Sequence, residues 1–352
     1  MSEQERQKIS DPPQSASPVR TALIGYGLAG SVFHAPLVHH TGGLALSAVV
    51  TANPARQADV LARYKGTEVF ESADEIWKNA SSYDLVVIAT PNDTHAPLAL
   101  TAMEKGLNVV VDKPFAISSQ QAEELIAVRN KTGVALSVFQ NRRWDADFLT
   151  LQELIRTKKV GTVMRLESRY ERYRPVPKPG GWRETTAPEL GGGLLFDLGS
   201  HLIDQAIVLF GKPLSVYAEV KTRRAGIPAD DDTFIALQFE NDVCAHLWVS
   251  LMAKVPGPRF RLMGTVGLFE KFGMDPQEDA LRSGMFPGLP GWGYEMPELS
   301  GKLYTNIDGI EFSGIILSKT GAYEQFYHRM RDAVRGLAPV PVPAEDALTT
   351  LR

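Results

Sequence analysis

The sequence predicts an α/β protein in two parts, a doubly wound parallel sheet followed by a domain built on an antiparallel sheet. In residues 19–139, short apolar segments alternate with amphipathic ones, which is typical of parallel strands covered by helices on both faces. From residue 142 onward, several segments alternate polar and apolar residues with a period of two, which indicates strands with one more polar face. We therefore expect the boundary between the two domains near residue 140.

The predicted elements of the first part follow in a regular order, and several helix ends carry their own signals. Asn53 before Pro54 favours a helix start, and Ser118 and Gly133 have the residue types of a helix start and a helix end. We expect strands at 21–24, 46–51, 84–90, 107–111 and 134–139, and helices at 28–40, from 53 onward, at 97–105 and at 118–132.

The second part begins with a predicted helix at 148–158 and an alternating strand at 163–173. The apolar spacing within 194–210 predicts an amphipathic helix. The stretch 272–300 is rich in Gly and Pro, which predicts a long ordered loop of the kind that often carries substrate or subunit contacts. Further strands are expected at 215–223, 233–239 and 243–251, with Asn241 and Asp242 forming a hairpin turn between the last two.

Composition limits the possible functions. A chain of 352 residues with 44% hydrophobic residues can bury two cores, and its net charge of −4 provides no field that attracts nucleic acid or an anionic membrane. The single cysteine, Cys244, excludes an internal disulfide and a cysteine-based metal site. Residues 1–18 are polar with three prolines, which predicts a disordered leader on a cytoplasmic protein. We expect no metal, and domains spanning 19–140 and 141–352.

The motif GYGLAG at residues 25–30 directly follows the first predicted strand. In a turn from strand to helix around a dinucleotide, Gly25 permits the tight turn, Gly27 lets the backbone approach the pyrophosphate, and Gly30 allows close packing of helix and strand. Three glycines at this spacing also occur in ordinary loops, so the position behind a strand carries the prediction. The expected cofactor contacts are Gly25, Tyr26, Gly27, Leu28, Ala29 and Gly30.

Two further segments lie where parallel strands are expected to end. Thr90-Pro91-Asn92 and Asp112-Lys113-Pro114 would reach the edge at which open α/β sheets bind ligands, so both are candidates for nicotinamide contacts. The proline after Lys113 disfavours helical backbone there and gives the ammonium group a defined direction. The alternative is a solvated lysine at a turn.

Asp197 and His201 lie four residues apart on the predicted helix 194–210, with Asp204 three residues further along. A carboxylate beside an imidazole orients it and raises its basicity, which suits the removal of a proton from an alcohol. The alternative is a surface ion pair of little consequence. His34, near the glycine loop, is interpreted as a packing or capping residue for which cofactor contact stays possible.

The run 140–145, Gln-Asn-Arg-Arg-Trp-Asp, follows the last strand of the predicted parallel sheet. Its amide and guanidinium groups could bind ribose, carboxamide or a polyhydroxylated substrate, or the run could be a latch between domains. Both interpretations stay open. From their expected position near the domain junction, Arg142, Arg143, Trp144, Tyr173 and Arg174 are candidates for contact with a hydroxylated ring.

The end of the second predicted strand bears on the choice between NADP and NAD. An NAD enzyme usually places Asp or Glu about 20 residues beyond the glycines, to bind the ribose 2′-hydroxyl. This chain has Thr51 and Asn53 there, with Arg56 in the first turn of the next helix. The sequence therefore favours NADP, with NAD or dual use as the alternative.

Several motifs in order resemble the Gfo/Idh/MocA oxidoreductase family: GYGLAGSVFHAP, ATPNDTH, VDKP, QNRRWD and GGGLLFDLGSHLIDQ. The resemblance covers the chain from Val19 nearly to its end, and within the family the NADP-dependent scyllo-inositol dehydrogenases are most similar, through NRRWD, the YRP at 173–175, DLGSH, the GPR at 257–259 and PQEDALR. The Glu-Lys-Pro signature of the family corresponds to Asp112-Lys113-Pro114, a conservative departure that keeps the lysine.

This resemblance implies an N-terminal Rossmann domain, a C-terminal α/β domain with a large open sheet, homodimers or homotetramers formed through that sheet, and a final helix that packs back on the nucleotide domain. It implies Lys113, Asp197 and His201 as catalytic residues, with His95 and Arg142 among the cofactor contacts. The expected reaction is hydride transfer between NADP and a secondary hydroxyl of a polyol or cyclitol. A same-family enzyme acting on an aldose or uronate with NAD, and a nucleotide-binding sensor without turnover, are the alternatives.

Overall fold

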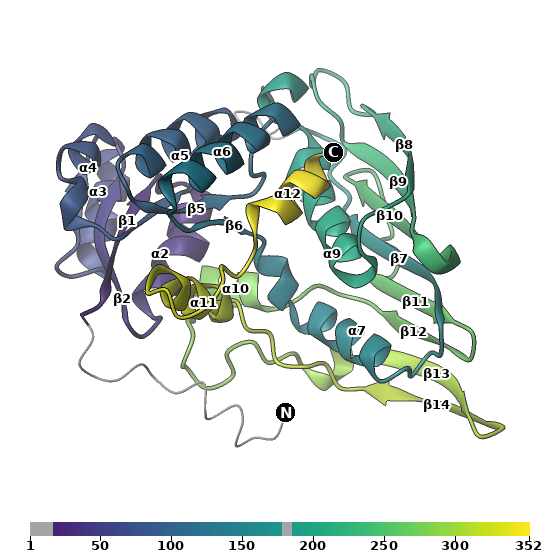
Figure 1. The fold of residues 1–352 in the computed structure, drawn as a ribbon. Coiled ribbons are helices and arrows are strands. Elements are labelled where there is room, and N and C mark those ends of the chain that lie inside the picture. The colour runs from purple at the N-terminus through teal and green to yellow at the C-terminus, as the bar shows by residue number, and fades with distance from the viewer. Residues whose placement is uncertain (1–16, 178–184) are drawn as a thin grey trace.

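The computed structural model describes residues 17–177 and 185–352, which form two sheets, one in each half of the molecule, with helices between them (Figure 1). The predicted leader lies almost wholly outside these residues. The first sheet is parallel throughout, with neighbouring strands in the order β3-β2-β1-β4-β5-β6. Its strands are β1 (Val19–Ile24), β2 (Leu44–Val50), β3 (Glu68–Phe70), β4 (Leu85–Ile88), β5 (Asn108–Asp112) and β6 (Leu136–Phe139).

The strand order reverses between β1 and β4, which creates the edge where ligands of doubly wound sheets bind. The helix signals in this part are correct: the Asn53 side chain accepts a bond from the Arg56 amide, Ser118 accepts one from the Gln121 amide, and Gly133 has a φ of 73°. The helical elements are η1 (Gly30–His34, a π-helical turn), α2 (Ala35–His39), α3 (Pro54–Arg63), α4 (Asp74–Lys78), η2 (Ala80–Ser82), η3 (Asn92–Thr94), α5 (His95–Glu104) and α6 (Ser119–Thr132).

The second sheet has the order β14-β13-β12-β11-β7-β10-β9-β8 and is antiparallel except for the pairing of β7 with β10. The predicted α/β class and mainly antiparallel second sheet are confirmed. The strands are β7 (Val163–Glu171), β8 (Ser215–Lys221), β9 (Asp232–Gln238), β10 (Cys244–Ser250), β11 (Phe260–Gly264), β12 (Gly267–Lys271), β13 (Gly301–Ile307) and β14 (Ile310–Ile316).

One face of this second sheet packs on helices. Leu166, Tyr170 and Leu247 are buried on it in one cluster with Phe148 of α7 and Leu202 of α9. The predicted loop 272–300 contains a short helix that the sequence pattern did not reveal. The helical elements of the second part are η4 (Asn141–Trp144), α7 (Ala146–Arg156), η5 (Pro188–Leu190), η6 (Leu195–Gly199, a π-helical turn), α9 (Ser200–Phe210), η7 (Glu240–Asp242), α10 (Gln277–Arg282), η8 (Pro297–Leu299), α11 (Glu324–Val334) and α12 (Ala344–Leu351).

The last segments of the chain return to the first sheet. Phe326 and Tyr327 of α11 belong to the same buried cluster as Phe139, and the Phe139 and Phe326 rings meet edge to face at 4.9 Å. Behind α11, the Ser137 hydroxyl donates to the Val342 carbonyl at 2.9 Å. Helix α12 then lies against both α6 and α9 (Figure 1). Packing thus joins the end of the chain to the nucleotide part.

One stretch of the described residues, Pro188–Phe210, is long and apolar enough to cross a membrane by length and composition alone. More than half of it is buried inside the protein, and it carries His201 and Asp204, both almost fully buried. These features are those of a core helix.

Candidate active site

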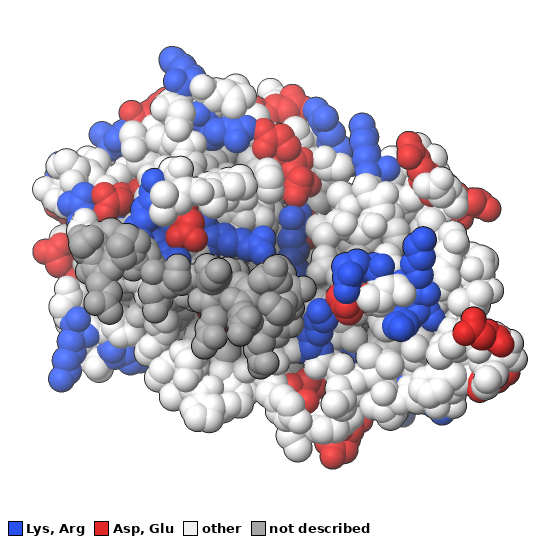
Figure 2. All heavy atoms as spheres, turned by 60° about the horizontal axis from the view of Figure 1, so that its bottom comes forward, with Lys and Arg blue, Asp and Glu red and all other residues white. Residues whose placement is uncertain are grey.

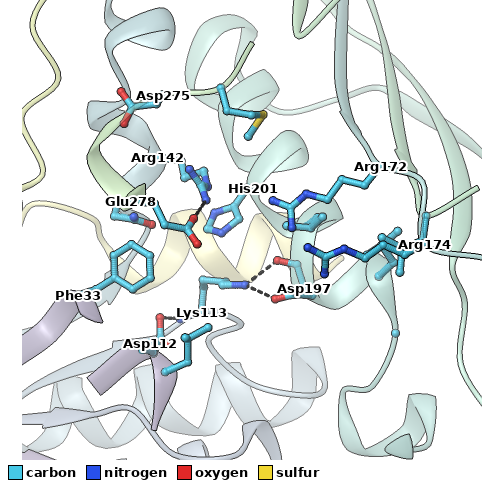
Figure 3. A pocket seen from close by; sticks show the side chains of 18 of the residues that line it. Phe33, Asp112, Lys113, Arg142, Arg172, Arg174, Asp197, His201, Asp275 and Glu278 are labelled. Carbon is cyan, nitrogen blue, oxygen red and sulfur yellow. Dashed lines mark hydrogen bonds and ion pairs between the residues drawn. The ribbon is translucent and has the colours of Figure 1, made fainter. Parts of the chain in front are cut away.

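A cavity of about 740 Å³ lies between the two parts of the molecule. Leu28 and Ala29 of the glycine loop line it together with Asp197 and His201, and Figure 3 shows the last two with Lys113 beside them. Lys113, which follows β5, reaches into it from the end of the parallel sheet. The three residues that the family resemblance implies as catalytic therefore face one space.

The glycine loop has the close contacts that a dinucleotide turn requires. Gly25 has a φ of 96°, and a Cβ there would lie 2.4 Å from the Ala89 carbonyl oxygen; a Cβ on Gly30 would lie 2.1 Å from the Gly25 oxygen. A Cβ on Gly27 would meet no atom within 4 Å, so this side of the loop is open. The loop is thus tightly packed at Gly25 and Gly30 and open at Gly27, an arrangement that fits a pyrophosphate against the backbone.

The other predicted cofactor residues of the first part have mainly structural contacts. The Tyr26 ring is buried and its hydroxyl donates to Asp59 at 2.7 Å, and the Asn92 amide donates to the Gly191 carbonyl at 2.8 Å. The ring nitrogens of His95 lie 2.8 Å from the Pro114 carbonyl and 3.0 Å from the Thr90 carbonyl, and burial lowers the pKa of this histidine. His95 therefore ties together the two segments that end β4 and β5.

At the end of β2, Thr51 is buried and its main chain continues the sheet toward Phe70. Asn53 caps α3, and Arg56 in the first turn of that helix is exposed to solvent. No carboxylate stands in the residues from Thr51 to Arg56. This end of the strand therefore presents neutral groups and one cation to the place where an adenosine ribose lies in this fold.

Lys113 and Asp197 form an ion pair at the centre of the cavity. The Lys113 ammonium lies 2.8 Å from Asp197 Oδ1 and 2.6 Å from the Asp197 carbonyl oxygen, and the two side chains are only 14% and 22% exposed. The pair joins the end of β5 to the π-helical turn η6, across 84 residues of chain. It holds the ammonium group in one place between the two domains.

His201 lies one turn beyond Asp197 and is 3% exposed. Its Nδ1 is 3.0 Å from the side-chain oxygen of Gln140, so Nδ1 donates and the lone pair is at Nε2. We predicted Asp197 as the group that orients this imidazole. In the structure the Asp197 carboxylate bonds to Lys113, and Gln140, directly after β6, lies at Nδ1 of His201.

Asp112 and His34 lie behind the lysine, beside the glycine-loop helix. His34 is fully buried, with Nδ1 at 2.6 Å from the Tyr327 hydroxyl and Nε2 at 3.8 Å from Asp112 Oδ1. Burial works against ionisation of Asp112, yet the neighbouring His34 and Lys113 hold its pKa below the usual value. His34 thus packs beneath the cofactor site rather than lining the cavity.

Arg142 lines the cavity but is already paired. Its Nη2 donates to Glu278 at 2.7 Å and its Nη1 to the Tyr323 hydroxyl at 3.2 Å. Despite burial, Arg142 keeps the pKa of the Glu278 carboxyl below its usual value. Glu278 and Asp275 come from the segment around α10, whose PQEDALR motif was part of the family resemblance but received no role from the sequence.

Three predicted substrate contacts do not lie at the cavity. Arg143 donates to both oxygens of Asp204 at 2.8 and 2.6 Å and to Asp346 at 3.0 Å, so these residues join η4 to α9 and α12. Trp144 is 7% exposed and packs edge to face on Phe326. Tyr173 is half exposed in a bridge to Met252. For Arg143 and Trp144 the structure favours the interpretation as a latch, because Asp204 and Phe326 are buried partners from other elements.

Comparison with known proteins agrees with this geometry. Residues 19–140 match the model of the oxidoreductase family with an NAD-binding Rossmann fold, and residues 148–270 match the GFO/IDH/MocA C-terminal domain. The chain belongs to the Gfo/Idh/MocA oxidoreductase family.

Relatives in the Gfo/Idh/MocA family match almost the whole chain. The uncharacterized oxidoreductase YdgJ of Escherichia coli is 38% identical over 95% of this chain and 93% of its own length. The scyllo-inositol 2-dehydrogenase (NADP(+)) IolW of Bacillus subtilis is 34% identical over 95% of this chain and 91% of its own length. The solved structure of yvaA from Bacillus subtilis superposes with a TM-score of 0.88 at 33% identity, covering 97% of this chain and 95% of that one.

Proposed function

We propose that this chain transfers a hydride between NADP and a secondary hydroxyl of a polyol or cyclitol, with scyllo-inositol as the first compound to test. The observation that carries the proposal is that Lys113, Asp197 and His201 line the same cavity as the glycine loop. The likeness to a relative named scyllo-inositol 2-dehydrogenase (NADP(+)) supports the substrate class.

In this proposal His201 is the general base. Its Nε2, left with a lone pair by the bond from Nδ1 to Gln140, takes the proton of the substrate hydroxyl. The Lys113 ammonium stabilises the negative charge that develops on the same oxygen, and Asp197 fixes the position of that ammonium. NADP, when bound, accepts the hydride that leaves the carbinol carbon. In the reverse direction the same groups protonate the oxygen of a ketone.

The proposed preference for NADP rests on the end of β2. Thr51 and Asn53 offer no carboxylate to repel a 2′-phosphate, and the exposed Arg56 can pair with it. We expect NADPH to bind more tightly than NADH at low salt, and Arg56→Ala to reduce that preference about fivefold, as an exposed ion pair allows. Tighter binding of NADH in a direct titration would contradict the assignment.

The activity is tested with a panel of substrates. The chain is incubated with NADP or NAD and with scyllo-inositol, myo-inositol, aldoses and isopropanol, and the absorbance of the reduced nicotinamide is followed. We expect oxidation of at least one cyclic polyol with NADP and none of isopropanol, since buried polar groups penalise analogues that lack matching hydroxyls. Oxidation of aldoses alone, with NAD, would favour the second same-family assignment. Cofactor binding without turnover of any compound would favour a sensor.

We also propose that two or four copies assemble through the outer face of the second sheet. Phe234, His246 and Trp248 form an aromatic group on that face, and Tyr217 and Tyr304 are 59% and 40% exposed there. Aromatic residues are enriched in protein interfaces. Light scattering coupled to gel filtration measures the mass, and a single-chain mass would contradict the proposal.

A further inference from the structure

Arg172 and Arg174 stand at the end of β7, where the main chain is still extended. The Arg172 amide donates to the Ser250 carbonyl at 2.8 Å and the Arg174 amide to the Leu251 carbonyl at 2.7 Å. Alternate side chains of an extended segment point to the same side. Both arginines therefore line the cavity, and Tyr173 between them is outside it (Figure 3). Their position is set by backbone bonds to β10.

These two arginines differ from the other cations of the cavity in having no side-chain partner among the residues that the structure describes. Lys113 is paired with Asp197, Arg142 with Glu278, and Arg224 with Asp231 at 2.8 Å. Arg282 shares Glu278 with Arg142. In residues 17–177 and 185–352, no hydrogen bond or ion pair engages the guanidinium group of Arg172 or Arg174. Positive charge is thus left unmatched at one end of the cavity.

That end is the one remote from the glycine loop. In Figure 3, Arg172 and Arg174 lie on the far side of the Lys113–Asp197 pair from Phe33 and Asp112, which belong to the first sheet and its glycine-loop helix. A pyrophosphate held at the glycine loop would therefore lie away from these two guanidinium groups. What they can reach is a molecule that occupies the substrate side of the cavity.

The charge at this place is local. The chain carries a net charge of −4, and on the face drawn in Figure 2 basic and acidic side chains are interspersed. A general attraction for anions over the surface is therefore not expected. Two neighbouring planar guanidinium groups in a cavity instead match the geometry of a carboxylate or a phosphate, which they bind through paired hydrogen bonds.

We propose that Arg172 and Arg174 form an anion subsite, and that the polyol oxidised at Lys113 and His201 carries a carboxylate or phosphate group. This inference rests on the proposed function, because it assumes that the substrate hydroxyl lies at His201. It narrows the proposed substrate class from polyols in general to polyols that carry a carboxylate or a phosphate group. The anionic group of the substrate would bind at Arg172 and Arg174, on the far side of the Lys113–Asp197 pair from the glycine-loop helix (Figure 3).

The test measures binding by calorimetry to the full chain saturated with NADPH, which cannot accept a hydride from the probe. Matched probes share a ring and differ in one anionic substituent: D-glucose against D-glucuronate and D-glucose 6-phosphate, and myo-inositol against an inositol monophosphate. We expect at least one acidic probe to bind about tenfold or more tightly than its neutral parent, since hydrogen bonds to charged groups are the stronger ones. The uronate and phosphate arms distinguish the two kinds of anion.

Variants assign the effect to these residues. The double variant Arg172→Met with Arg174→Met is expected to lose the preference for the acidic probe. The double variant Arg172→Lys with Arg174→Lys is expected to keep part of that preference. Arg223→Met is the matched control: it removes one arginine charge nearby, from an exposed guanidinium that pairs with Asp232 outside the cavity. It is expected to bind all probes as the parent chain does. Circular dichroism checks that each variant folds.

Equal binding of acidic and neutral probes, no binding of any acidic probe, or an equal loss in Arg223→Met would each overturn the subsite. The outcome is separable from the proposed function. If neutral cyclitols are oxidised and acidic ones do not bind, the function stands and the subsite fails. If acidic probes bind through the two arginines and none is oxidised, the subsite stands and the proposed reaction fails.

Discussion

The two walls of the cavity are built in different ways. The cofactor wall is main chain: Gly25 and Gly30 pack so closely that a Cβ on either would overlap a carbonyl oxygen. The substrate wall is made of side chains that come from distant elements, such as Lys113 after β5, Asp197 in η6 and Gln140 after β6. The cofactor wall is therefore encoded by a few adjacent residues, and the substrate wall depends on how the second domain docks.

This difference predicts different responses to mutation. On the substrate wall, a side chain can be removed without disturbing the cofactor turn, so chemistry and cofactor binding should separate. On the cofactor wall, a Cβ added to Gly25 or Gly30 would displace backbone, so cofactor binding and stability should change together. Four experiments test whether the two walls respond in these different ways.

The largest effect is expected for His201→Ala. Loss of a general base typically lowers turnover by about 10²–10⁴-fold. Because His201 bonds to Gln140 and is separated from the glycine loop by the cavity, NADPH affinity should stay unchanged. Steady-state kinetics and fluorescence titration of NADPH give the two values. Turnover within a few-fold of the parent chain would remove His201 as the base, and lost NADPH binding would show a structural role.

The next effect concerns the latch of Arg143 with Asp204 and Asp346, which joins η4 to α9 and α12. Asp204 is 1% exposed and receives two bonds from Arg143, so Asp204→Asn leaves a buried guanidinium half-paired. We expect a loss of about 3–5 kcal/mol in the free energy of unfolding, measured in urea. Asp346→Asn removes the partner of the same arginine that is 40% exposed and should cost about 1 kcal/mol or less. Equal effects of the two changes would contradict a buried latch.

The third experiment follows stability with pH at Asp275. Burial, with the nearby Asp147, raises the pKa of Asp275 to about 6. A raised pKa stabilises the folded state below the unfolded pKa, and that contribution is lost as the pH rises through about 6. Because of Asp275, the free energy of unfolding should fall by about 3 kcal/mol between about pH 4 and about pH 7. In urea unfolding, the free energy of unfolding of Asp275→Asn should therefore depend less on pH than that of the parent chain. The same pH dependence in both proteins would contradict the assignment.

The smallest effect is expected on the cofactor wall, for Gly30→Ala. Its Cβ would lie 2.1 Å from the Gly25 carbonyl oxygen, so the loop must shift, at a cost of about 1–3 kcal/mol. We expect lower thermal stability together with weaker NADPH binding. Gly27→Ala is the control for thermal stability, because neither Gly27 nor Gly30 has a positive φ and a Cβ on Gly27 would meet no atom within 4 Å. Unchanged NADPH affinity in Gly30→Ala would break the comparison between the walls.

The parts that the sequence predicted correctly depend on neighbours in the chain. The helix caps at Asn53 and Ser118 form bonds to residues three positions further along the chain. The glycine loop likewise depends on the close approach of Gly30 to Gly25. Strand β3 was missed because three partly exposed residues are too short to show a period. Helix α10 was missed because its six residues lie in a stretch dominated by Gly and Pro.

The sequence alone determined the dinucleotide turn, five of the six strands of the parallel sheet and the presence of Lys113, Asp197 and His201, since these rest on local backbone chemistry, hydrophobic periodicity and motifs. Only the tertiary structure decided which polar side chains face the cavity. Arg142 and Arg143 are adjacent, yet one lines the cavity and the other is buried in the latch. The direction of a side chain follows from its partner, and those partners, Glu278 and Asp204, are 136 and 61 residues away.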